Sequence, residues 1–208
     1  MSKTASRIIS IIVAAGEGRR LGSNKALLEV AGVPALTRPL SVTQDSRVGD
    51  TIVVTGSRGA EVATLAAAHG SRHTPNPNWQ RGMTTSIQAG IRALPVDCLA
   101  FLIQPVDHVL TTAADLDALV EAFAAHGTPD LAILRPRHDA LFGHPVLFAR
   151  SYGDEFLALN DDQPGHTVYR RHRSRVTAIP VANPHIRMDL DTPEDLQRAE
   201  AILRAAMD

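Results

Sequence analysis

Residues 8–25 read IISIIVAAGEGRRLGSNK, an apolar run that leads directly into a glycine-rich loop. Successive side chains of a strand point to opposite faces, and Ile and Val fall on both faces of this run. Such a pattern is typical of a central parallel strand buried on both sides. Glycines at positions 16, 18 and 22 let the backbone approach a ligand closely just after this strand. Ligands bind at the carboxyl ends of strands in open α/β sheets, so this segment predicts both a fold class and a binding site.

The rest of the chain alternates short apolar runs with amphipathic stretches. We expect further strands at 51–55, 98–104, 131–134, 145–149 and 176–181, and a brief one ending at Leu190. We expect helices at 34–44, 57–69, 85–94 and 112–126, and a last one opened by Thr192-Pro193. The alternation predicts one three-layer α/β domain over residues 1–208, Rossmann-like with a mainly parallel sheet.

Three local expectations can be compared with the structure. Pro39 should kink or shorten the helix at 34–44. Thr85 should be the N-cap of the next but one helix, with Gln88 as its capping-box partner. Residues 152–175 are the least regular stretch and form either an insertion on the substrate side or ordinary surface structure.

Composition narrows the function classes. The chain of 208 residues has 21 Lys and Arg against 22 Asp and Glu, so a broadly basic nucleic-acid binder is not expected. Cys98 is the single cysteine and cannot form an internal disulfide, which favours a reducing cytoplasm. Lys3 and Arg7, followed by the apolar run from Ile8, resemble the start of a signal peptide. However, this run is short for a signal peptide and no separate cleavage region follows it. No stretch approaches the ~20 apolar residues of a membrane span.

The loop matches neither of two common phosphate-binding motifs. A dinucleotide fingerprint needs glycine where Leu21 stands, and a P-loop needs Lys directly after the last glycine, whereas Lys25 comes three residues after Gly22. Successive backbone N–H groups in such a loop can still bind phosphate, with Arg20 and Lys25 adding positive charge. The alternative is a mobile strand-to-helix connection with surface arginines.

A resemblance to a known family rests first on this loop. The pattern Ala14-Ala15-Gly16-x-Gly18-x-Arg20-Leu21-Gly22-x-x-Lys25 resembles the signature of nucleotidyltransferases with the nucleotide-diphospho-sugar transferase fold. The nearest group is the molybdenum cofactor cytidylyltransferase-like one, which usually has serine at the position of Gly18. The resemblance implies that the loop backbone and Arg20 bind the β- and γ-phosphates of a nucleoside triphosphate. It also implies that Lys25 neutralises the α-phosphate.

A second motif covers residues 78–90, NWQRGMTTSIQAG, and is similar to the family's Asn-x-x-Trp-x-x-Gly-Met signature. By this resemblance Gly82 and Ser86 contact the base. The alternative is a capped helix after a loop, with Trp79 packed as a partly buried aromatic residue. Ala14-Ala15-Gly16 resembles the cytidylyltransferase form, since guanylyltransferase relatives tend to have Ala-Gly-Gly, and this favours CTP.

Acidic residues supply a candidate metal site. Asp107 follows an apolar strand, and an acid there is well placed to meet a nucleotide-bound cation; Mg²⁺ prefers oxygen ligands. Asp189-Leu190-Asp191 precedes the last helix, and alternation puts both acids on one side of an extended segment. The run resembles the family's Asp-Ile-Asp-Thr-Pro-Glu-Asp, which makes Asp191 the candidate second metal ligand and Asp189 the next choice. The alternatives are a turn at Asp107 and a well-capped helix after Asp191.

Gly143-His144-Pro145 matches a Gly-x-Pro element of the family and by resemblance lines the acceptor side, although a structural turn explains it equally well. Together these motifs imply a Mg²⁺-dependent nucleotidyltransferase domain that acts on a nucleoside triphosphate and a phosphorylated acceptor. Molybdopterin-bound molybdenum is the favoured acceptor, with a molybdoenzyme as a candidate recipient of the product. The alternatives are a sugar-phosphate nucleotidyltransferase, a guanylyltransferase or a non-catalytic nucleotide-binding chaperone module.

Overall fold

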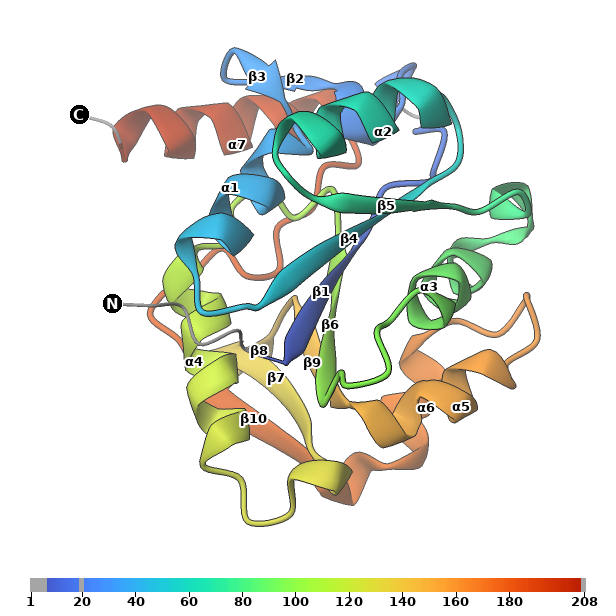
Figure 1. Cartoon of the computed structure of the whole chain (residues 1–208). Helices are drawn as coiled ribbons and strands as arrows, with labels where there is room; N and C mark the ends of the chain where they lie inside the picture. Colours follow the sequence, from blue (N-terminus) through green and yellow to red (C-terminus); the bar gives the residue numbers. More distant parts are fainter. Residues whose placement is uncertain (1–6, 19–20, 207–208) are drawn as a thin grey trace.

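A twisted, mostly parallel sheet forms the centre of the molecule in a computed structural model that describes residues 7–18 and 21–206 (Figure 1). The strand order is β10-β7-β9-β6-β1-β4-β5, with β8 paired to β7. The strands are β1 (Ile8–Val13), β4 (Asp50–Thr55), β5 (Arg72–Pro75), β6 (Ala100–Pro105), β7 (Ile133–His138), β8 (Leu141–Phe142), β9 (Val146–Ala149) and β10 (Val176–Pro180). The predicted α/β class with a mainly parallel sheet is confirmed.

The central strand is the apolar run that opens the chain. β1 pairs in parallel with β4 on one side and with β6 on the other, whereas β9 lies antiparallel to both β6 and β7. All six residues of β1 are buried, as continuous apolar patterning requires of a strand covered on both faces. The carboxyl ends of β1, β4 and β6 therefore meet the start of β9 at one edge of the sheet.

Helices cover both faces of this sheet. They are α1 (Thr37–Asp45), α2 (Gly59–Ala68), α3 (Met83–Arg92), α4 (Ala113–Ala124), α5 (Gly153–Leu157), α6 (His166–Arg171) and α7 (Pro193–Ala205). Side chains of β1 alternate between the two layers: Ile11 packs in a core cluster with Ile87 of α3, and Ile12 in a cluster with Leu40 of α1. Figure 1 shows α1 and α4 on one side of the sheet and α3, α5 and α6 on the other.

Two helix starts differ from their prediction. Residues 33–34 form β3 (Val33–Pro34), which pairs with β2 (Glu29–Val30), and α1 begins only at Thr37. Pro39 is thus in the first turn of α1, where its missing N–H is unneeded, and α1 continues past it to Asp45. The N-cap of α3 is Gly82, not Thr85, whose hydroxyl donates instead to main-chain oxygens of the preceding turn. The side-chain amide of Gln88 donates to the main-chain oxygens of Phe156 in α5 and Leu159 after it instead of capping α3.

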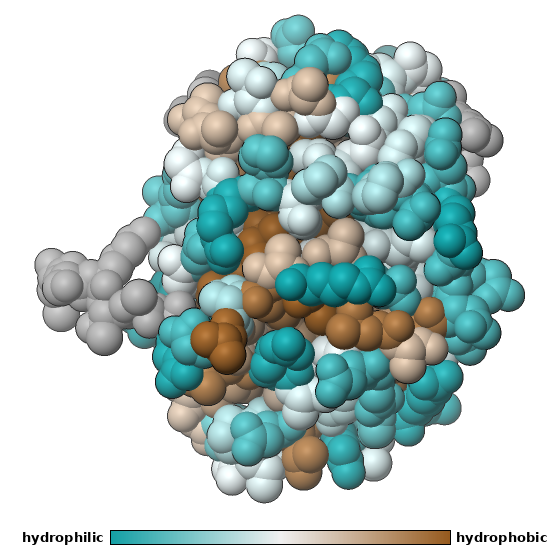
Figure 2. All heavy atoms as spheres, turned by 45° about the vertical axis from the view of Figure 1, so that its right-hand side comes forward, coloured by the Kyte–Doolittle hydropathy of each residue, from teal (hydrophilic) through white to brown (hydrophobic). Residues whose placement is uncertain are grey.

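The irregular stretch after β9 is structured. Residues 152–175 contain α5 and α6 and end in the 3-10 helix Arg173–Arg175. They pack against α3 on the face that Figure 2 presents, where a hydrophobic band crosses the middle of the surface. The described residues form no strand ending at Leu190, and none of their helices is long and apolar enough to cross a membrane.

Candidate functional site

The glycine-rich loop is held at the edge of the sheet by backbone contacts. Ala14 donates its N–H to the Val54 carbonyl (3.1 Å), and the Ala15 carbonyl accepts from Ser57 (2.9 Å), so both residues tie the loop to the end of β4. Gly18 has φ +68°, and a Cβ there would lie 2.0 Å from the Ser23 carbonyl oxygen. The chain therefore needs glycine where the related group usually has serine, because the loop folds back on itself at this point.

Lys25 follows this loop and joins two carboxylates from distant parts of the chain. Its Nζ lies 2.7 Å from Oδ2 of Asp107, just after β6, and 2.6 Å from Oδ1 of Asp191, just before α7. Asn24 fixes the start of this turn, since its side chain accepts from Ala26 N–H and donates to the Ser57 carbonyl. The structure thus brings together three of the predicted site residues.

These contacts set the charge state of Lys25. Burial alone would lower the pKa of its ammonium group, but the charge and hydrogen bond of Asp107, and then those of Asp191, outweigh burial and raise the pKa above its usual value. Lys25 therefore remains protonated at neutral pH. Its side chain is 20% exposed and that of Asp107 16%, so solvent screens this pair less than an ordinary surface ion pair.

Three acids form a group that can hold a divalent cation. Asp107, Asp189 and Asp191 each offer a carboxylate oxygen, and these atoms lie within 4.8 Å of one another. Asp195 helps to hold this segment, because its carboxylate accepts from the Asp191 N–H (3.3 Å) while it forms the capping box of α7 with Thr192. Carboxylate oxygens are the donors that hard divalent cations prefer, so the donor set fits such an ion.

A cleft of about 210 Å³ opens beside Lys25. Its wall includes Gly16 and Gly18 of the loop, Gly82 and Ser86 at the start of α3, and Asp107. The predicted phosphate and base segments therefore face one space. Of the other predicted residues, Gly22 has φ +65° on the exposed side of the loop, and Arg20 lies outside the described residues.

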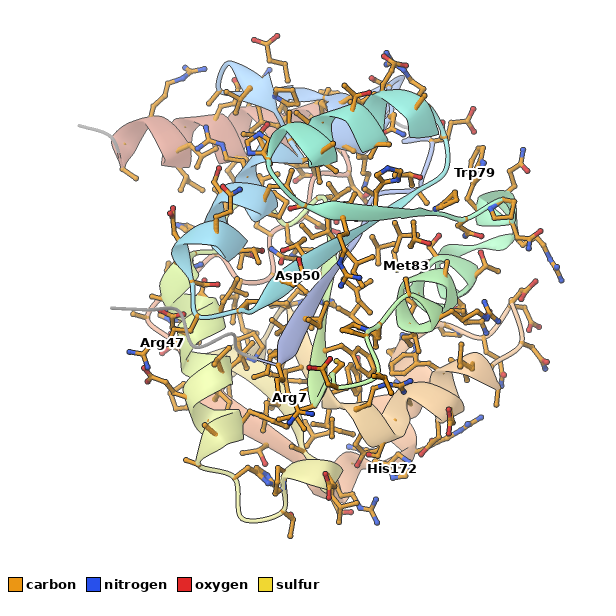
Figure 3. All side chains as sticks on the ribbon, viewed as in Figure 1. Arg7, Arg47, Asp50, Trp79, Met83 and His172 are labelled. Atoms are coloured by element: carbon orange, nitrogen blue, oxygen red, sulfur yellow. The ribbon has the colours of Figure 1, made fainter. Side chains whose placement is uncertain are left out.

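Trp79 and Met83 complete this wall from the segment that leads into α3, and Figure 3 shows both side chains on the α3 side of the sheet. Gly82 between them has φ +127° and ψ 170°, a conformation that suits only glycine. Asn76, which the sequence reasoning missed, donates its side-chain amide to Thr85 (2.8 Å) and Ser86 (2.9 Å). A sequence signal existed, since Asn76 stands three residues before Trp79, as the first position of Asn-x-x-Trp-x-x-Gly-Met requires.

One of the two predicted acceptor residues borders a second, more apolar pocket of about 210 Å³. His144 lines it, and its ring centroid lies 4.7 Å from that of His108. Gly143 is buried, and a Cβ there would lie 2.3 Å from the Ile186 carbonyl oxygen, so this glycine permits close packing. Met83 and Pro105 line this pocket and the cleft beside Lys25, so the two spaces adjoin.

Burial governs the two histidines. It lowers the pKa of His144 to about 4, with further lowering by the nearby His108 and Arg135. Burial also lowers the pKa of His108. Both rings are therefore neutral at pH 7, and the Nδ1 atom of each is buried without a hydrogen-bond partner among the described residues. His166 and Tyr169 of α6 also line the apolar pocket, and the sequence reasoning assigned neither a role there.

Known proteins share similarity with the part of the chain that carries this site. A family model described as "MobA-like NTP transferase domain" matches residues 10–176. The chain is 32% identical to the molybdenum cofactor guanylyltransferase of Rhodobacter capsulatus, over 95% of this chain and 97% of that protein. It is 29% identical to the bifunctional IPC transferase and DIPP synthase of Rubrobacter xylanophilus, over 92% of this chain. The chain spans about half (51%) of that longer protein.

A solved structure supports the same fold. A nucleotidyl transferase from Methanothermobacter thermautotroptrophicus superposes with a TM-score of 0.79, at 19% identity, over 95% of this chain and 98% of its own. The nucleotide-diphospho-sugar transferase type of fold is thereby confirmed. The family match extends from β1 to the beginning of β10 and includes the glycine-rich loop, Lys25 and Asp107. This chain belongs to the family of MobA-like NTP transferase domains.

Proposed function

We propose that this chain is a nucleotidyltransferase that moves a nucleoside monophosphate from a triphosphate to a phosphorylated acceptor and releases pyrophosphate. The observation that carries the proposal is the position of Lys25, between two carboxylates at the edge of a glycine-lined cleft. An oxygen of the acceptor phosphate attacks the α-phosphorus, a new P–O bond forms, and the bond between the α-phosphorus and its bridging oxygen to the β-phosphate breaks. The acceptor oxygen is already ionised, so the reaction needs no general base.

The chain's own residues bind and orient the reactants. Lys25 places a permanent positive charge beside the transferring phosphate, where negative charge is spread in the transition state. Backbone N–H groups of the loop, from Gly16 to Gly22, and the side chain of Arg20 bind the leaving pyrophosphate. Gly82 and Ser86 contact the base. Catalysis of this kind needs positioning and charge neutralisation more than a protein nucleophile.

Asp107 and Asp191 are the proposed ligands of Mg²⁺, with Asp189 as a third carboxylate close enough to take part. When bound, Mg²⁺ would supply positive charge to the phosphates in addition to that of Lys25. A module that only binds nucleotide has no need for both acids beside the lysine, and this favours the enzyme over the non-catalytic alternative.

CTP is the proposed donor and molybdopterin-bound molybdenum the proposed acceptor. The Ala14-Ala15-Gly16 form of the loop supports CTP, whereas the guanylyltransferase name of the Rhodobacter relative makes GTP the second candidate. His144 and Gly143 face the acceptor in this assignment, and a molybdoenzyme is the candidate recipient of the product.

The test is pyrophosphate release by the purified protein with each of the four ribonucleoside triphosphates, in Mg²⁺ or in EDTA. Each is assayed with molybdenum-loaded molybdopterin, with glucose 1-phosphate and without acceptor. We expect release with CTP that requires both the acceptor and Mg²⁺. Preference for GTP would overturn the base assignment alone. Release with glucose 1-phosphate but not with molybdopterin would replace the acceptor, and no release under any condition would contradict the enzyme itself.

A further inference from the structure

A basic cleft that the proposed reaction does not use lies beyond the apolar pocket. It has a volume of about 830 Å³ and is lined by Arg135, Phe142, Tyr169, Arg170, Arg173 and Val176. We refer to these six residues as the arginine cleft. Three guanidinium groups face it, and no carboxylate does among the described residues, so its charge favours an anion. The groups come from β7, α6 and the 3-10 helix Arg173–Arg175, which are far apart in the sequence.

Arg135 is held ready for a ligand by two aromatic rings. Its guanidinium carbon lies 4.8 Å from the ring centroid of Phe142 and 4.5 Å from that of Tyr169, so the planar group is stacked and fixed in orientation. Its Nε is buried and has no hydrogen-bond partner among the described residues. Arg135 as a residue lines the cleft, so the remaining N–H groups of its guanidinium are the ones that can donate to an anionic oxygen there.

The arginine cleft is continuous with the proposed reaction site through shared wall residues. Tyr169 lines both the arginine cleft and the apolar pocket, and Met83 and Pro105 line both the apolar pocket and the cleft beside Lys25. The hydrophobic band in Figure 2 crosses the face that carries α3 and α6, which contribute Met83 and Tyr169. Starting from Lys25, the order of spaces is therefore the glycine-lined cleft, the apolar pocket and the arginine cleft.

We propose that the acceptor carries a second anionic group, remote from its reacting phosphate, and that Arg135, Arg170 and Arg173 bind this group. The middle of the acceptor is then a flat or apolar portion that lies along Met83, Pro105 and Tyr169. This inference rests on the proposed function for the reacting end of the molecule. The anion-binding property of the arginine cleft rests on the residues of the cleft alone.

Flavin mononucleotide is a suitable probe because it joins a planar ring to a phosphate, and riboflavin is the matched compound without the phosphate. Equilibrium dialysis with fluorescence detection measures the dissociation constant of each with wild type, Arg170→Gln and Arg173→Gln. Arg171→Gln is the control, because it removes the same charge from α6, next to Arg170, at a residue that does not line the cleft. We expect each cleft variant to weaken flavin mononucleotide binding by about tenfold and Arg171→Gln by about twofold or less.

An equal loss of affinity for flavin mononucleotide in all three variants would overturn the site. Equal affinity for flavin mononucleotide and riboflavin would also overturn it, as would complete displacement of flavin mononucleotide by CTP. The binding result does not depend on turnover, so it stands or fails apart from the pyrophosphate assay. Where that assay identifies an acceptor, Arg173→Gln should raise the KM of the acceptor and leave the KM of the triphosphate unchanged. An unchanged acceptor KM would contradict the assignment of the cleft to the acceptor.

Discussion

At the scale of single residues, Lys25 has the largest consequence for chemistry. It is held within hydrogen-bonding distance of two acids that are themselves candidate metal ligands, and its raised pKa keeps it charged. Binding of a cation to Asp107 and Asp191 would compete with these contacts and free the ammonium group for the phosphate. The same three side chains can therefore neutralise one another in the free protein and act on a ligand when it is bound.

Lys25→Ala should lower kcat by about 10²- to 10³-fold, because an oriented charge at the transferring group contributes a few kcal/mol to the transition state. The KM for the triphosphate should change much less. Steady-state pyrophosphate release gives both constants, and Arg47→Ala is the control, since Arg47 pairs with Glu121 at the exposed surface. A rise in KM with unchanged kcat would make Lys25 a ground-state binding residue.

His144 should make stability depend on pH. Its pKa is about 4 in the folded protein against an ordinary 6.5, so the unfolded chain takes up the proton first as the pH falls. Stability from this group is therefore complete above pH 6.5 and is lost towards pH 4. Between pH 7 and 4.5, wild type should lose about 2 kcal/mol more unfolding free energy than His144→Gln. Urea denaturation at both pH values measures this, and parallel losses would show that His144 is not involved.

At the scale of elements, the packing of α3 on the sheet depends on Gly90. A Cβ at this position would lie 2.4 Å from Cγ2 of Ile11 in β1 and 3.1 Å from Cγ2 of Val54 in β4. α3 also carries Ser86 and has Gly82 as its N-cap, so its distance from β1 determines the shape of the cleft beside Lys25. Close helix–strand contact thus connects core packing with the site.

Gly90→Ala should destabilise the protein by about 1–3 kcal/mol, because overlap with the sheet outweighs the better helix propensity of alanine. Gly59→Ala in α2 is the matched control, since its Cβ would make only ordinary contacts of 3.6 Å and 3.7 Å with Thr55. Urea denaturation should show the control as neutral or stabilised. Equal effects of the two substitutions would contradict this account of the α3 interface.

Sequence patterns predicted elements well where apolar periodicity is strong. The apolar strands β1, β4 and β6 and the capped helices α4 and α7 lie where expected. β5 was not expected, because Arg72–Pro75 is a short, polar edge strand that pairs with β4 alone among the described strands. The start of α3 was misplaced because Thr85 fits an N-cap by type, whereas the positive φ of Gly82 that begins the helix follows from tertiary structure.

At the scale of the whole molecule, the sheet edge brings together residues that are distant in the chain. Asp107 lies 82 positions from Lys25 and Asp191 lies 166 positions away, and family motifs were needed to associate them. Tyr169 belongs to no motif, so only the folded structure places it at the pockets. Asn76 fits the first position of Asn-x-x-Trp-x-x-Gly-Met, but its hydrogen bonds to Thr85 and Ser86 follow only from the structure. The predicted roles of individual site residues remain predictions for the experiments above.

Ligand binding should stabilise the whole fold. Mg²⁺ and CTP at about 100 times the dissociation constant should add about 2.7 kcal/mol to the unfolding free energy. For a chain of this size that raises Tm by about 5–10 °C in differential scanning fluorimetry. In wild type, EDTA should remove the part of the Tm rise that depends on Mg²⁺, and Asp107→Asn should lack that same part. An equal Tm rise in wild type with and without Mg²⁺ would contradict the metal assignment.

Strand β6 has parallel β1 on one side and antiparallel β9 on the other, so the direction of the strands changes at this point of the sheet. The glycine-rich loop follows β1, whereas His144 and the arginine cleft belong to the segment from β7 to the start of β10. In the proposed assignment, exchange of the segment from β7 to β10 would change the acceptor side and leave the triphosphate loop, Asp107 and Asp191 in place. Chimeric enzymes that exchange this segment are therefore a route to new acceptor specificity.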